Sequence, residues 1–343
     1  SLGWLTVPAA TLESTAGVLS FVEEVKRAGF THTVLLGMGG SSLCPEVCRA
    51  TFGTVPAFLD LQVLDSTAPA SVAGVEKSVD LGRTLFLVSS KSGGTVETLS
   101  FYKYFYDRVQ SLTGERAGAN FLAITDPATS LENLARARNF RAVFPGQPDI
   151  GGRFSALSNF GMVPAALAGV DVRALLERAE RMVRACGPSL PARDNPGVAL
   201  GAVLGVAARA GHDKVTLVMS PGIYTFADWA EQLIAESTGK EGKGLLPVVR
   251  EHLAEPAAYG DDRLFVHMRL ASEADEKVER RLRALEAAGH PVVRIELEST
   301  LDLSQEFFRW EVATATAGAL LGINPFDQPN VQESKDNTNR LLA

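Results

Sequence analysis

The sequence has little cysteine and no long apolar run, and each shortage excludes a class of protein. Among 343 residues only Cys44, Cys48 and Cys186 are cysteines, too few and too scattered for a disulfide framework. No apolar run approaches membrane-spanning length, and the N-terminus lacks a basic stretch followed by an apolar core. We therefore expect a cytoplasmic protein without a membrane partner.

Basic charge is also scarce. The chain has 33 Lys and Arg against 40 Asp and Glu, a formal charge of -7, which argues against nucleic acid as a partner. Cys44 and Cys48 would share one helix face, but no histidine joins them, so we expect two buried small residues there. Because no His, Asp and Glu set has ligand spacing, the sequence predicts neither a metal nor another cofactor.

What is present is a repeated alternation of β-branched, apolar runs with amphipathic stretches. It predicts an α/β fold with doubly wound parallel sheets. A segment rich in Gly and Pro at residues 186–191 is typical of a linker, so we predict two domains, residues 1–185 and 186–343. A first helix should begin near Thr11, and a last long helix should end at Gly322. Strands are expected near residues 31–36, 61–64, 84–88, 120–124, 215–219, 264–268 and 291–295.

Two strand-to-helix turns in the first half, at residues 37–42 and 89–95, carry the clearest chemistry. Their small residues let a ligand approach the backbone, and each following helix offers unpaired amides and the positive end of its dipole. Neither turn continues as a nucleotide-binding loop. Tight packing alone explains the first turn equally well, whereas the second favours phosphate binding. The residues of these turns assigned here to substrate or phosphate binding are Gly39, Gly40, Ser41, Ser90, Lys91, Ser92, Thr95 and Thr98.

Five segments spread along the chain are distinctive when taken together. They are Gly-Met-Gly-Gly-Ser-Ser-Leu at residues 37–43, Ser-Lys-Ser-Gly-Gly-Thr-Val-Glu-Thr at 90–98, Gly-Gly-Arg-Phe-Ser-Ala-Leu-Ser at 151–158, Ala-Glu-Ser-Thr-Gly-Lys at 235–240, and Asn-Pro-Phe-Asp-Gln at 324–328 with Lys335 beyond it. These segments resemble motifs of the phosphoglucose isomerase family and occur in that family's order. The resemblance implies two tandem sugar isomerase (SIS-type, flavodoxin-like) domains, the first with the phosphate loop and the second with a catalytic glutamate.

The resemblance implies an aldose–ketose isomerase of carbohydrate metabolism that interconverts glucose 6-phosphate and fructose 6-phosphate through a cis-enediolate. Glu236 matches the family's base, and Arg153 matches the arginine that faces the enediolate. Gln328 matches a substrate-contacting glutamine, and Lys335 matches the lysine assigned to ring opening. The resemblance also implies a homodimer.

Histidine is where the sequence departs from the family, because the Gly-Gln-His context of the ring-opening histidine is absent. Of the five histidines, His252 follows Glu236 in a polar loop and is our candidate for the catalytic role. His267 lies in an apolar strand, where a core position is expected. The others are expected to be structural or surface residues: His32, His212 and His290.

Two other functions remain open at this point. The isomerase half of a glucosamine-6-phosphate synthase has a similar length, but its phosphate loop and C-terminal tail differ from Lys91, Gly94 and residues 324–335. A non-catalytic sugar-phosphate-binding module usually has one domain and no base. The chain is short for the family, so it resembles either a compact phosphoglucose/phosphomannose isomerase or the isomerase part of a transaldolase fusion.

Overall fold

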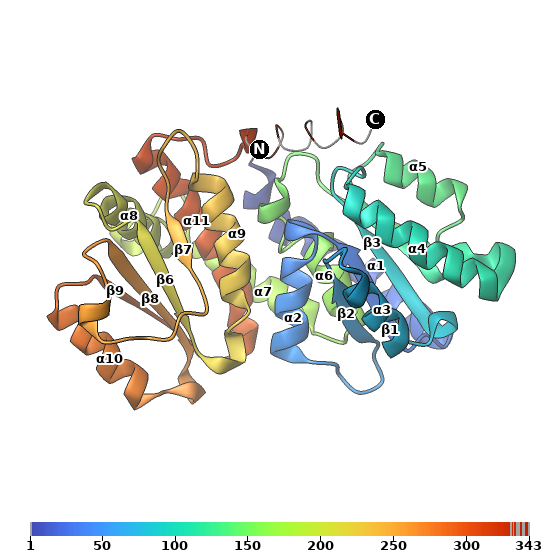
Figure 1. The fold of residues 1–343 in the computed structure, drawn as a ribbon, viewed down its shortest axis with the longest axis horizontal. Helices are drawn as coiled ribbons and strands as arrows, with labels where there is room; N and C mark the ends of the chain where they lie inside the picture. Colours follow the sequence, from blue (N-terminus) through green and yellow to red (C-terminus); the bar gives the residue numbers. More distant parts are fainter. Residues whose placement is uncertain (1, 330, 332, 334–336, 338–339, 342–343) are drawn as a thin grey trace. The chain divides into compact units, whose positions relative to one another are not determined.

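The computed structural model describes residues 2–329, 331, 333, 337 and 340–341. The chain forms two compact units, Ser1–Glu180 and Arg181–Ala343, called unit 1 and unit 2 below (Figure 1). The division falls inside helix α7 (Val172–Ala185). In the described part of the chain, no helix is both long and apolar enough to cross a membrane.

Unit 1 is built on one parallel sheet in the order β2-β1-β3-β4-β5. This is the strand order of flavodoxin-like folds, in which the chain starts at an interior strand, adds the strand on one side and then crosses to the other side. Leu35 lies opposite Val63 on one side and Leu87 on the other, so β1 is a buried interior strand of the sheet. The strands are β1 (His32–Gly37), β2 (Asp60–Leu64), β3 (Thr84–Ser89), β4 (Phe121–Thr125) and β5 (Ala142–Pro145).

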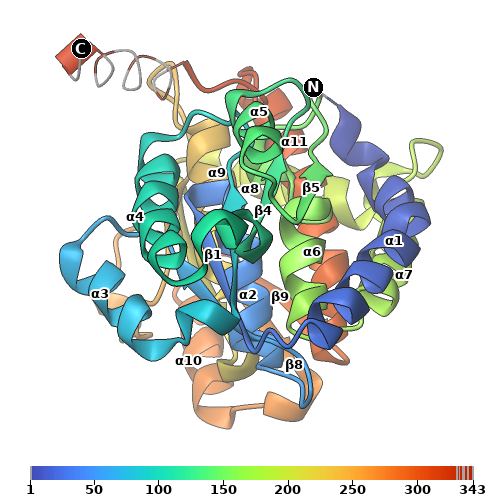
Figure 2. The same ribbon diagram turned by 90° about the vertical axis from the view of Figure 1, so that its right-hand side faces the viewer.

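Helices cover both faces of the unit 1 sheet, and Figure 2 shows α4 on one side with α1 and α6 on the other. Alternate strand residues pack against α4, where Phe86 lies between Phe105 and Phe121 with ring centroids 4.8 and 5.1 Å away. The helices are α1 (Val7–Arg27), α2 (Leu43–Phe52), α3 (Pro69–Ser78), α4 (Val96–Thr113), α5 (Ser130–Ala137) and α6 (Asn159–Leu167).

Unit 2 repeats this plan with one strand fewer, in the order β7-β6-β8-β9, again all parallel. Its helices α8 and α11 approach closely because Gly197, Gly201 and Gly205 form a stripe: a Cβ on any of them would come within 2.9 Å of α11. The elements are β6 (Lys214–Met219), β7 (Leu246–Val248), β8 (Arg263–Leu270), β9 (Val292–Leu297), α8 (Pro196–Arg209), α9 (Phe226–Thr238), α10 (Glu276–Ala287) and α11 (Leu303–Leu321).

The predicted α/β fold is confirmed, but two short edge strands and the start of the first helix differ from the prediction. The sequence did not indicate β5 or β7, which are short edge strands carrying Pro145 and Pro247; proline is tolerated at sheet edges and obscures the strand pattern. Helix α1 begins at Val7, with Pro8 in its first turn, rather than near Thr11. As expected, Cys44 and Cys48 are buried free cysteines, and α11 ends at Gly322 in the left-handed conformation.

Candidate active site

The strand order of unit 1 reverses between β1 and β3, and ligands of such sheets bind at the carboxyl ends of the strands beside that point. Both turns singled out in the sequence follow these two strands. Residues 38–42 follow β1 and include the short 3-10 helix η2 (Gly39–Ser41), while residues 90–95 follow β3. Ser89 links them, because its hydroxyl donates to the Ser41 carbonyl oxygen at 3.1 Å.

The first turn lies directly against the segment that carries Arg153. Gly40 touches the short 3-10 helix η5 (Gly152–Phe154) so closely that a Cβ on Gly40 would lie 2.3 Å from the Gly152 carbonyl oxygen. The Ser155 hydroxyl donates to the Gly152 carbonyl oxygen at 2.6 Å and closes the turn behind the arginine. Sequence positions more than 110 apart are therefore brought together at the switch point of unit 1.

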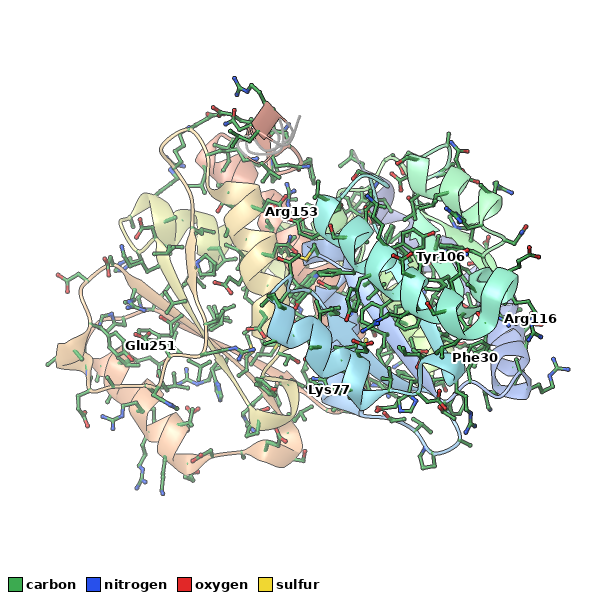
Figure 3. All side chains as sticks on the ribbon, turned by 45° about the vertical axis from the view of Figure 1, so that its right-hand side comes forward. Phe30, Lys77, Tyr106, Arg116, Arg153 and Glu251 are labelled. Atoms are coloured by element: carbon green, nitrogen blue, oxygen red, sulfur yellow. The ribbon has the colours of Figure 1, made fainter. Side chains whose placement is uncertain are left out.

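Arg153 is almost fully buried. Its side chain, labelled in Figure 3, is only 2% exposed, and its guanidinium carbon lies 5.3 Å from the centroid of the Phe154 ring. A buried guanidinium keeps its charge, because arginine does not deprotonate in proteins. The structure thus buries a positive charge on the segment whose backbone touches the first turn.

The second turn leads into α4 without a side-chain cap from its N-cap residue, Thr95. Instead, the Thr95 hydroxyl lies 2.9 Å from that of Ser90, which bridges the two ends of the loop. The first amides of α4 therefore keep their capacity to bind an anion. Among the described residues, none lies within hydrogen-bonding distance of the buried Thr98 hydroxyl, which is in this first helical turn. Ser92 is exposed at the tip of the loop.

Two long-range contacts fix the shape of the second turn. Gly93 has a φ of +69°, and a Cβ there would lie 2.6 Å from Thr129, so the tight loop requires glycine. The Lys91 ammonium forms an ion pair with Asp126, the residue after β4, and the Asp126 amide donates to the Lys91 carbonyl oxygen at 3.1 Å. Lys91 therefore ties the loop to the neighbouring strand.

Unit 2 carries the other candidate residues. Glu236 lies in the last turn of α9, half-buried, and its Oε2 accepts a hydrogen bond from Gln232 Nε2 at 3.2 Å. Gln328 is half-buried beyond the end of α11. Lys335 lies outside the described residues. His252 is exposed in the loop after β7.

Two other histidines occupy structural positions. His267 lies in β8, 6% exposed, with Nδ1 3.0 Å from the Val218 carbonyl oxygen, and burial lowers the pKa of its ring. Because a carbonyl oxygen only accepts, Nδ1 carries the hydrogen. His290 packs edge-on against Phe265 and Tyr259.

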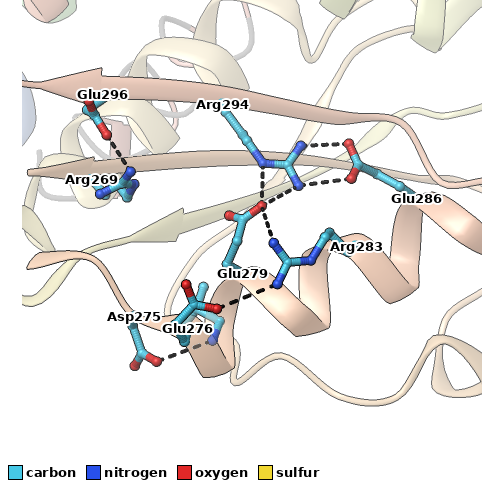
Figure 4. Close-up of polar contacts among 9 residues, drawn as sticks. Arg269, Asp275, Glu276, Glu279, Arg283, Glu286, Arg294 and Glu296 are labelled. Carbon is cyan, nitrogen blue, oxygen red and sulfur yellow. Dashed lines mark hydrogen bonds and ion pairs between the residues drawn. The ribbon is translucent and has the colours of Figure 1, made fainter. Parts of the chain in front are cut away.

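A cavity of about 370 Å³ beside α10 and β9 offers charged groups, but they neutralise one another. Arg294 donates to both oxygens of Glu286, at 2.6 and 2.9 Å, and also to Glu279 (Figure 4). Arg269 forms an ion pair with Glu296. These pairs account for the arginine charges, so this cavity lacks the excess positive charge that a phosphate would need.

Sequence reasoning missed three charged residues that shape these segments. Asp126 could have been found, because it follows a predicted strand and the carboxyl ends of parallel strands meet at one edge of the sheet. Lys240 and Asp327 lie inside quoted motifs, but their ion pair joins residues 87 positions apart. A lysine next to glycine gives no local signal of burial.

Known proteins resemble this chain in sequence and in fold. The family model described as phosphoglucose isomerase matches residues 20–261. A glucose-6-phosphate isomerase of Rubrobacter xylanophilus is 30% identical over 97% of this chain and 87% of that protein. One from Thermosynechococcus vestitus is 37% identical over 62% of this chain but only 40% of its own length. The crystal structure of a hypothetical protein from Thermus thermophilus has a TM-score of 0.86 at 25% identity, covering 100% of this chain and 90% of that one.

Two parallel-sheet units, with glycine- and serine-rich turns at the first switch point, define a two-domain α/β protein of the sugar isomerase type. The chain belongs to the phosphoglucose isomerase family. This confirms the resemblance drawn from the five sequence segments. The family model ends at residue 261, so Gln328 lies beyond it, within the wider span aligned with the Rubrobacter protein.

Proposed function

We propose that this protein interconverts glucose 6-phosphate and fructose 6-phosphate through a cis-enediolate. The observation that carries the proposal is the convergence, in a member of this family, of the uncapped α4 N-terminus, the Gly39–Ser41 turn and the buried Arg153 at one switch point. The reaction moves one proton between C2 and C1 and requires no net oxidation, so the groups that it needs are a phosphate anchor, a base and a charge-stabilising cation.

The α4 turn suits the phosphate group. The amides of the first helical turn and the helix dipole favour a dianion, and hydroxyls supply further donors. We assign this role to Ser90, Ser92, Thr95 and Thr98, of which Thr98 has a buried hydroxyl suited to a ligand oxygen. Lys91 adds positive potential to the loop while its ammonium stays paired with Asp126.

The Gly39–Ser41 turn and Arg153 suit the reacting part of the sugar. The backbone of Gly39 and Gly40 allows a hydroxyl to approach closely, and Ser41 ends the turn. A guanidinium held by its surroundings stabilises negative charge as it develops without reorganising, which lowers the barrier to enediolate formation.

Proton transfer is assigned to unit 2. Glu236, half-buried at the end of α9, takes the proton from C2 or C1 and returns it to the neighbouring carbon. Gln328 orients the sugar hydroxyls. We assign the opening of the sugar ring to Lys335 and His252. Together they donate a proton to the ring oxygen and accept a proton from the anomeric hydroxyl. His252 is exposed, which is compatible with a contribution to the site of a second copy of the chain.

Three wider proposals rest on the family resemblance. The protein acts as a homodimer in the cytoplasm, which light scattering on the purified protein and localisation of a tagged copy would test. Activity on mannose 6-phosphate and a link to a transaldolase domain are the two variants that the short chain suggests. Assaying both aldose phosphates side by side decides the first of them.

The experiment for the main proposal is a coupled assay of fructose 6-phosphate conversion, with Glu236→Gln as the test variant. We expect turnover by the parent and a loss of about 10²–10⁴-fold in kcat for E236Q, the usual contribution of a general base. Binding of sugar phosphate without turnover would instead favour a non-catalytic binding module. Formation of glucosamine 6-phosphate when ammonia is supplied would favour the synthase-type alternative.

A further inference from the structure

Lys240 is the one residue of the 235–240 segment that is both charged and almost fully buried in unit 2. It follows the end of α9, four residues after Glu236, and is 6% exposed. Its ammonium donates to the carbonyl oxygens of Asn324 and Asp327, at 2.7 and 2.6 Å, and to the Asp327 carboxylate at 2.6 Å. All three contacts fall on the short segment that follows α11 and ends at Gln328.

These contacts account for the whole hydrogen-bonding capacity of the ammonium, which has three donors and no acceptor. Burying a charge is costly unless it is paired and fully hydrogen-bonded, and here it is both. With its donors committed to the protein, Lys240 is a poor candidate for a substrate ligand or a proton donor. Instead, Lys240 holds two segments of unit 2 together, and its ammonium with the three oxygens of Asn324 and Asp327 is called the clamp below.

Both sides of this clamp are rigid. On the α9 side, the Thr238 hydroxyl donates to the Ile234 carbonyl oxygen at 2.8 Å and accepts from the Leu245 amide at 2.9 Å, which fixes the chain around Lys240. On the other side, Asn324 accepts from the Phe326 amide at 3.1 Å and donates to Asp327 at 3.2 Å. The segment therefore folds into a tight turn around the ammonium.

We propose that Lys240 is a positioning residue that holds the segment carrying Gln328 in a fixed relation to the end of α9, which carries Glu236. The inference rests on the proposed isomerase function, because it gives Gln328 and Glu236 their roles. One lysine thereby couples the proposed base to the proposed substrate contact within unit 2. A displacement of about 1 Å at such a contact can cost about 100-fold in rate.

The test compares Lys240→Met with Lys243→Met, a matched control in the same loop. Lys243 is exposed, and within the described part of the chain its ammonium makes a single long hydrogen bond, 3.5 Å to the Gly322 carbonyl oxygen. For K240M we expect kcat for fructose 6-phosphate to fall about 100-fold while inhibition by inorganic phosphate stays unchanged, because the phosphate loop belongs to unit 1. K243M should keep the parent values for both.

Asp327→Asn is a second, milder variant that weakens the same contact. It removes the negative charge of the partner, while its amide oxygen can still accept a hydrogen bond from Lys240. It should lower kcat less than K240M does, and it replaces K240M in the assay if K240M does not fold. Parent-like kcat in K240M, or joint loss of turnover and phosphate inhibition in folded protein, would overturn the positioning role.

A separate measurement distinguishes failure of this inference from failure of the proposed function. Amide hydrogen exchange at residues 324–328 should be faster in K240M than in the parent and unchanged in K243M. If the parent shows no isomerase activity but exchange responds as expected, the clamp stands and the assigned reaction is wrong. If exchange in K240M equals that of the parent, the clamp itself is refuted.

Discussion

At the switch point of unit 1, the turns after β1 and β3 are built from glycine and hydroxyl residues, whereas unit 2 fills the equivalent place with its own carboxylate. There, the turn after β6 forms the 3-10 helix η7 (Pro221–Ile223), and the Gly222 amide donates to Glu273, 2.9 and 3.1 Å from its two oxygens. Glu273 ends η9 (Ala271–Glu273), which follows β8. The turn after β3 in unit 1 thus leaves the helix N-terminus without a side-chain cap, whereas the turn after β6 in unit 2 donates an amide to a carboxylate of its own unit.

Glu236, the proposed base of unit 2, lies toward the other end of the strands. Helix α9 connects the parallel strands β6 and β7, so its last turn, with Glu236, returns toward the amino ends of the strands. In the proposed site, the repeated fold therefore does not repeat its use. The proposal places phosphate binding at the switch point of unit 1, and it places the base and the substrate-contacting glutamine of unit 2 at a helix end and in the segment after α11.

Among the variants that alter the packing of one unit, Gly40→Ala in unit 1 is expected to have the largest effect on activity and stability together. The added methyl group would meet the Gly152 carbonyl oxygen at 2.3 Å and force the first turn away from Arg153. We expect a loss of about 100-fold or more in kcat/KM together with about 1–3 kcal/mol of destabilisation, measured by steady-state kinetics and urea unfolding.

The matched control for this variant is Gly152→Ala on the opposite side of the same contact. A Cβ at Gly152 meets nothing within 4 Å, so its stability should stay within about 0.5 kcal/mol of the parent. Equal stability and activity of both variants would show that the close approach of the two segments is not required.

A smaller effect, confined to the pH dependence of stability, is expected from the titration of a buried carboxyl group of unit 2. Burial raises the pKa of Glu306 on α11 to about 7 from 4.5, although Arg309 opposes the shift; Asp302 and Trp310 also face it. The folded state therefore keeps this proton while the unfolded state releases it. As a result, the contribution of Glu306 to stability is lost as pH rises from about 4.5 through 7, by up to about 3 kcal/mol.

Glu306→Gln removes this titration and should flatten that part of the pH profile. Thermal unfolding at about pH 5 and about pH 8 measures it: the variant should gain stability relative to the parent at the higher pH more than at the lower. An identical pH dependence in parent and variant would contradict the assignment. Burial also raises the pKa of Glu311 on the same helix, so a residual slope in E306Q is expected.

The smallest effect is expected from Glu273→Ala, which removes the carboxylate that accepts a hydrogen bond from the turn after β6 in unit 2. Loss of a charge-assisted contact to the Gly222 amide should cost about 1–2 kcal/mol in unfolding free energy. Turnover should stay at the parent level, because this turn holds no proposed site residue. A strong loss of kcat in folded protein would mean that the unit 2 switch point takes part in the reaction.

Much of this architecture could be predicted from the sequence, because local patterns determine it. The buried strands at residues 84–88 and 264–268 are continuous apolar runs between helical stretches, and both were found where expected. The edge strands β5 and β7 were missed because four and three residues, each set including proline, carry too little pattern.

Only part of the candidate site could be predicted from the sequence. The two turns after β1 and β3 carry local glycine and serine signals, so their residues could be named from the sequence. The packing of Gly40 on Gly152 and the Lys240–Asp327 pair depend on contacts between distant positions, which no local pattern encodes. Lys335 stays a prediction, because it lies outside the described residues.

The central claim is that unit 1 binds the phosphate group while unit 2 supplies the base. The most direct test is a calorimetric titration of Glu236→Gln with glucose 6-phosphate, performed beside a turnover assay of the same sample. The account predicts parent-like affinity with kcat reduced by about 10²–10⁴-fold, since the removed carboxylate acts in proton transfer rather than in phosphate binding. Parent-like turnover in E236Q, or loss of binding with it, would contradict the account.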